Sequence, residues 1–113
     1  MDDRIPALMK RVVEWLVNGN FEAAEAYSNG IRLSAGLIRE AICGYGKKLV
    51  MPPESAFSNL DVIEVVGTIS PTWSIRFDLW TDKEGISDLT LECTMIDRGG
   101  KALALEIDNL HVL

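Results

Sequence analysis

The stretch Trp73-Ser74-Ile75-Arg76-Phe77-Asp78-Leu79-Trp80 decides the fold, because apolar and polar side chains alternate along it. Successive side chains of a β-strand point to opposite faces of the sheet, so this alternation predicts a strand with one buried face. We expect a strand over residues 73–81. Its inner face would carry Trp73, Ile75, Phe77 and Leu79, and its outer face would carry Arg76, Asp78 and Trp80.

Working outward, three more strands are expected, over residues 60–66, 89–96 and 102–113. Short glycine-containing connections after residues 82 and 96 predict antiparallel hairpins. The strands over residues 89–96 and 102–113 should also direct their apolar side chains to the inner face: Leu89, Leu91, Cys93, Met95, Leu103, Leu105 and Ile107. Along the last strand the apolar positions then change phase, which predicts a β-bulge near Asp108-Asn109. The strand expected over residues 60–66 does not alternate cleanly, so the sequence leaves open which of its faces is buried.

The first half of the chain has helical periodicity instead. Apolar residues recur at helical spacing over residues 3–18, and further helices are expected over 21–28 and 35–44, the last with Ser34 as its N-cap. Residues 51–55 include Pro52-Pro53 and should be neither regular helix nor central strand. The sequence therefore predicts one α+β domain over residues 1–113, with three N-terminal helices packed on one face of a four-stranded antiparallel meander.

Composition sets further bounds. A chain of 113 residues with 48% hydrophobic residues can bury a core without a disulfide or metal. We expect Cys43 and Cys93 to be buried free thiols, with a bridge between them left open. The longest apolar runs fall far short of the roughly 20 residues that span a bilayer, and residues 1–4 do not begin a signal peptide. A cytoplasmic protein is the expectation.

Charge is distributed unevenly. Residues 1–59 hold seven acids and seven bases, whereas residues 60–113 hold ten acids and four bases, so the net charge of −6 lies in the second half. This balance disfavours nucleic-acid binding and favours a basic protein partner. The residues expected to bind that partner, on the outer sheet face, are Asp78, Trp80, Asp82, Asp88, Glu92, Glu106 and Asp108. A solvated sheet face without a partner is the alternative.

No motif predicts a reaction. The only histidine is His111, and the sequence has no zinc motif, EF-hand loop or P-loop, so we expect no catalytic residues, metal or cofactor. An alternative is a small-molecule pocket between helices and sheet, lined by Tyr27, Tyr45, Asn109 and His111.

Several segments resemble a small bacterial family of unknown function. They are Trp73-Ser74, Leu79–Thr81 with Glu84-Gly85 and Ser87–Glu92, and Glu106–Leu113. With Arg32–Ala35 and Tyr45-Gly46, the resemblance covers most of residues 15–113. It implies no activity that can be assigned to single residues.

Two looser resemblances suggest functions. Helices followed by a meander are similar to nuclear-transport-factor-2-like rolls, which implies a small-molecule-binding domain or an enzyme. The size, acidity and fold class resemble immunity proteins of bacterial contact-dependent growth inhibition. That likeness implies a non-enzymatic binding protein whose partner is a basic toxin, such as a nuclease domain. A homodimer formed through a sheet edge or the helices is a further expectation.

Overall fold

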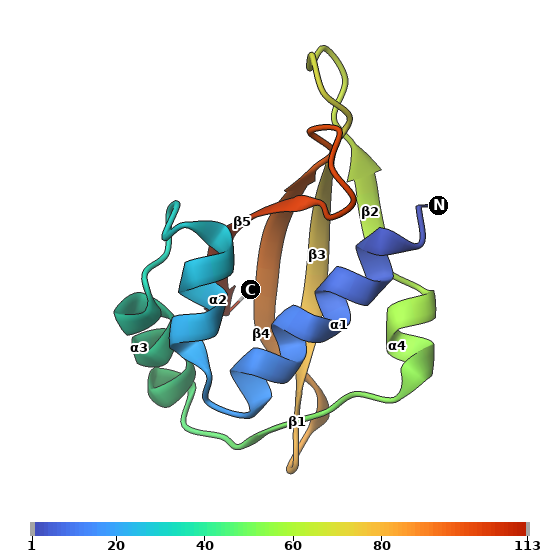
Figure 1. The fold of residues 1–113 in the computed structure, drawn as a ribbon. Coiled ribbons are helices and arrows are strands. Elements are labelled where there is room, and N and C mark those ends of the chain that lie inside the picture. The colour runs from blue at the N-terminus through green and yellow to red at the C-terminus, as the bar shows by residue number, and fades with distance from the viewer. Residues whose placement is uncertain (1, 113) are drawn as a thin grey trace.

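A computed structural model describes residues 2–112, in which helices cover one face of an antiparallel sheet (Figure 1). The elements are α1 (Arg4–Val17), α2 (Phe21–Ser28), α3 (Ala35–Tyr45), β1 (Leu49–Val50), α4 (Glu54–Ser58), β2 (Asp61–Glu64), β3 (Thr72–Thr81), β4 (Gly85–Ile96) and β5 (Ala104–Val112). The predicted α+β class, with N-terminal helices followed by a strand meander, is confirmed. None of these helices is long and apolar enough to cross a bilayer.

The sheet has five strands where the sequence predicted four. Strand β3 is central: β4 pairs with one of its edges, and β1 and β2 share the other. On that shared edge β2 pairs with residues 73–76 and β1 with residues 80–81. The prediction missed β1 because two residues are too few to show an alternation. Strand β2 is also shorter than the expected 60–66, and Leu113, the expected end of the last strand, lies outside the described residues.

The three predicted helices form close to their expected bounds, and Ser34 Oγ accepts a hydrogen bond from Leu37 N at 3.2 Å as the N-cap of α3. The expectation that residues 51–55 would not be helical was wrong in part, because α4 begins at Glu54. A proline disfavours helical backbone at the residue that precedes it, so Pro53 keeps Pro52 out of the helix. Pro53 itself has extended backbone and directly precedes the first turn of α4. Phe57 of α4 stacks on Phe77 of β3, with ring centroids 5.1 Å apart.

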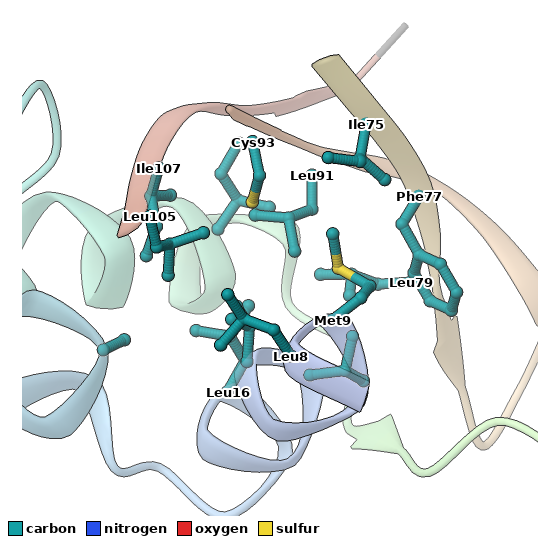
Figure 2. Close-up of a cluster of buried hydrophobic side chains, with 14 of the residues drawn as sticks. Leu8, Met9, Leu16, Ile75, Phe77, Leu79, Leu91, Cys93, Leu105 and Ile107 are labelled. Atoms are coloured by element: carbon teal, nitrogen blue, oxygen red, sulfur yellow. The ribbon is translucent and has the colours of Figure 1, made fainter. Parts of the chain in front are cut away.

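Helix α1 lies across the sheet and supplies one side of the core. Leu8, Met9 and Leu16 pack toward the inward side chains of β3, β4 and β5 (Figure 2). Each fully buried aliphatic side chain contributes about 1.5–3 kcal/mol through removal of apolar surface from water. Tyr27 Oη donates a hydrogen bond to Leu103 O at 3.0 Å, which ties α2 to the segment before β5.

The two cysteines differ. Cys93 is buried in the sheet as expected, and burial raises the pKa of its thiol. The expectation that Cys43 is also buried was wrong: Cys43 is exposed, because it lies away from the α3 stripe that contacts the core through Ala35 and Ile38. Neither cysteine is bridged.

The predicted bulge in the last strand is confirmed. Glu92 lies opposite Asn109 and Cys93 opposite Ile107, so Asp108 is the extra residue of β5. The bulge returns Leu110 to the core face. A second irregularity lies between β3 and β4, where Asp78 and Trp80 pair with Thr90 and Ile86. There the buried Ser87 Oγ donates to Leu79 O at 2.6 Å.

Candidate functional site

The sheet face opposite α1, which we name the outer face, carries the residues expected to bind a partner. The predicted orientation of β3 and β4 is observed, since Ile75, Phe77 and Leu91 are buried. Asp78 is exposed and Trp80 is partly exposed. The indole is therefore available to a partner rather than sealed in the core.

Carboxylates at the centre of the outer face already have partners within the chain. Glu92 Oε1 lies 3.1 Å from His111 Nε2 and 3.7 Å from Arg76 Nε. Asp78 Oδ1 accepts a hydrogen bond from Thr90 Oγ1 at 2.7 Å. These contacts fix the side chains and neutralise part of the negative charge, so the centre is less acidic than the sequence suggests.

On the β5 side of the outer face, Arg32 neutralises part of the negative charge. This residue comes from the loop between α2 and α3. Its Nε lies 2.9 Å from Asp108 Oδ1, and its terminal nitrogen lies 3.5 Å from Glu106 Oε1. Sequence reasoning missed this base because Arg32 and Glu106 are 74 positions apart and belong to different layers. Glu106 and Asp108 are thus poor candidates for free partner-binding charges.

Asp108 is held in an unusual environment. Its Oδ2 accepts a hydrogen bond from Thr94 Oγ1 at 2.5 Å, whereas its buried Oδ1 receives no hydrogen bond. Arg32 Nε, 2.9 Å from Oδ1, contributes positive charge without making a hydrogen bond to it. Burial raises the pKa of Asp108, and the Thr94 hydrogen bond and the Arg32 charge oppose that rise.

Free negative charge gathers instead at the β3–β4 hairpin. Asp82 and Asp88 are exposed, and within residues 2–112 their carboxylates have no hydrogen-bond or ion-pair partner. Glu84 between them differs, because Tyr45 Oη donates to it at 2.9 Å and Lys47 Nζ lies 3.5 Å away. The Tyr45 hydrogen bond is the main reason that the pKa of Glu84 is lowered.

A recess of about 370 Å³ lies beside Trp80, next to this hairpin. Its walls include Pro53, Asn59, Asp61, Asp78, Trp80 and Ile86. It forms where the shared edge of β3 is interrupted, because the registers of β1 and β2 leave residues 77–79 without a strand partner there. Sequence reasoning did not find this recess, because part of its lining belongs to the unpredicted helix α4.

The residues expected to line a cleft between helices and sheet lie apart. Tyr27 bonds to Leu103, Tyr45 bonds to Glu84, and His111 lies on the outer face against Glu92. Asn109 is exposed at the bulge. Among residues 2–112, no three His, Cys, Asp or Glu side chains converge in a way that would hold a metal ion.

Comparison with known proteins gives the family. No curated protein and no solved structure matches the chain. One family pattern, described as a domain of unknown function (DUF7668), matches residues 13–113. That match takes in the last five residues of α1 and every later element, including the whole outer face. The chain therefore belongs to this family, a domain of unknown function.

Proposed function

We propose that the protein is a non-enzymatic binding protein that holds a basic protein partner against its outer face. The single observation that supports this most is at the hairpin end of that face. There the unpaired carboxylate of Asp82 lies two positions after the partly exposed Trp80, and that of Asp88 two positions after Ile86, the strand partner of Trp80. The partner class we propose is a toxin nuclease domain, in the manner of an immunity protein. In such a complex, carboxylates would occupy positions otherwise taken by substrate phosphates.

The chemistry of the face suits recognition in two steps. Unpaired carboxylates attract a basic protein over a distance of about one Debye length, roughly 8 Å at physiological salt, and speed the encounter. A partly exposed tryptophan then supplies the kind of anchor that dominates many interfaces. Ile86, which pairs with Trp80 and is 61% exposed, adds apolar surface beside it.

The remaining expected residues have a supporting part in this proposal. Glu92, Glu106 and Asp108 are each within 4 Å of a basic group of the same chain, so they add less to long-range attraction. They instead hold β4, β5 and the α2–α3 loop in register. We also propose a cytoplasmic location, because both cysteines are free thiols.

The nuclear-transport-factor-2-like alternative has less support. It requires the side chains of Tyr27, Tyr45 and His111 to converge on one cleft. Their polar contacts are instead with three separate residues, namely Leu103, Glu84 and Glu92. A roll that binds small molecules usually places its polar groups around a single cavity.

Matched charge variants test the proposal. Asp82→Asn/Asp88→Asn removes two free carboxylates from the outer face, and Glu14→Gln/Glu40→Gln removes two exposed carboxylates from the helices. A partner is captured from the host lysate, purified and identified, and its association rate with each variant is measured across a salt series. We expect the outer-face pair to slow association severalfold at low salt and to flatten its salt dependence, with a clearly smaller effect from the helical pair. Equal effects from the two pairs would show that net charge, rather than this face, attracts the partner.

A further inference from the structure

We propose that the recess beside Trp80 receives an arginine side chain of the partner. This inference rests on the proposed function, which supplies the basic partner, and it deepens that function by naming the group recognised. The volume of the recess, about 370 Å³, falls within the range of ligand pockets, about 300–1,000 Å³.

The first argument is the backbone. Alternate residues of a strand direct their N–H and C=O groups to the same edge. Thr72 O accepts from Val65 N of the segment after β2 at 2.8 Å, so the peptide groups of Thr72, Ser74, Arg76 and Asp78 face this edge. Pairing with β2 stops at Arg76, and pairing with β1 resumes at Trp80. The peptide groups of Asp78 therefore face the recess, and its carbonyl can accept a hydrogen bond there.

The second argument is the excess of acceptors. Asp61 has an exposed carboxylate, and Asp78 has committed only Oδ1, to Thr90. Asn59 Nδ2 donates to Ser55 O at 3.2 Å, which leaves the amide oxygen of Asn59 able to accept. Arg76 also lines the recess, and its Nε lies 3.7 Å from Glu92 Oε1, so the two carboxylates of Asp61 and Asp78 outnumber the one cation among the lining residues. Several acceptors around one hollow favour a ligand with many N–H donors.

The third argument is the set of aromatic and apolar side chains that line the recess beside the acceptors. Trp80 offers a flat indole, and Pro53 and Ile86 offer apolar surface. A guanidinium is planar, stacks on aromatic rings and presents five N–H donors, whereas a lysine ammonium is compact and strongly hydrated. An acidic ligand would face Asp61 and Asp78, and an apolar ligand would bury their charge without compensation. Arginine is the side chain that suits both the acceptors and the apolar lining.

A peptide titration tests the inference. The ¹⁵N-labelled protein is titrated with acetyl-Gly-Arg-Gly-amide and, separately, with the same peptide carrying citrulline, norleucine or glutamate. We expect the arginine peptide to shift the Trp80 indole N–H and the amides of Asn59, Asp61 and Asp78, with an affinity at least about fivefold above that of the uncharged citrulline isostere. Asp61→Asn and Trp80→Leu should each weaken arginine binding severalfold. Glu40→Gln, at an exposed position of α3 away from the outer face, should leave it within about twofold.

Three results would overturn the inference: citrulline or norleucine binding as tightly as arginine, glutamate binding more tightly, or arginine-induced shifts centred away from the recess. Its failure is separable from failure of the proposed function. If arginine misses the recess while Asp82→Asn/Asp88→Asn still slows association with the partner, only this inference falls. If arginine binds in the recess but that double variant behaves like the helical pair, the outer face loses its role in attracting the partner.

Discussion

Asp108 is the residue whose environment differs most from the sequence prediction. Its carboxylate was expected to be free to bind a partner, and it instead contacts Thr94 and Arg32 of the same chain. The bulge displaces it from regular pairing, Thr94 donates to one oxygen, and the other oxygen is buried beside Arg32 without a hydrogen bond. Because burial raises its pKa above the unfolded value, the native state holds the proton more tightly than the unfolded chain does. The free energy of unfolding contributed by Asp108 should therefore fall as pH rises from 3.8 through its folded pKa.

Removing the Arg32 charge should raise the pKa of Asp108 further. We expect the ¹³C-detected carboxyl titration of Asp108 to move to higher pH in Arg32→Gln, since the cation favours the ionised form. Arg39→Gln is the matched control, because Arg39 pairs with Glu22 on the helices. An unchanged Asp108 titration in Arg32→Gln would show that the contact is not maintained in solution.

Among the secondary-structure elements, sequence periodicity predicted the long amphipathic helices and strands and missed the shortest helix and the shortest strand. The ten residues of β3 and the fourteen of α1 carry several repeats of their pattern, so their inward faces were predictable. Helix α4 and β1 are five and two residues long and depend on tertiary contacts instead. The recess could not be predicted for the same reason, since residues of α4 and its two ends form part of its lining.

Helix α4 should depend mainly on Phe57. This side chain is 4% exposed and stacks on Phe77. We expect Phe57→Ala to lower the free energy of unfolding by about 3–5 kcal/mol, and Phe57→Leu to cost clearly less, as measured by urea denaturation. A loss below about 1 kcal/mol for Phe57→Ala would mean that α4 does not pack on the sheet as the structure shows.

The hairpin joining β2 to β3 projects beyond the rest of the sheet (Figure 1). Val66 is 88% exposed and Ile69 is fully exposed at its tip. In a monomer, Val66→Ser/Ile69→Ser should change the free energy of unfolding by less than about 1 kcal/mol, because neither side chain is packed. Thermal unfolding at several protein concentrations checks this. A large, concentration-dependent loss would instead show that a second copy covers the tip.

For the whole molecule, the sequence predicted the layers, the direction of each face and the charge split. It overstated the acidity of the outer face, because the bases that neutralise Glu92, Glu106 and Asp108 come from distant positions or from a neighbouring strand. Pairing of this kind depends on how layers meet, which periodicity does not encode. On the outer face, the carboxylates that stay free are those of Asp82 and Asp88 at the β3–β4 hairpin and of Asp61 beside the recess, and the account of function rests on that end of the face.

The most direct measurement is cross-saturation NMR on the complex of the deuterated, ¹⁵N-labelled protein with its unlabelled basic partner. This method reports which amides lie against the partner. The account predicts signal loss at the Trp80 indole and at the amides of Asp82, Ile86 and Asp88, with α1 unaffected. Signal loss concentrated on α1 or α3, with the Trp80 indole untouched, would contradict it.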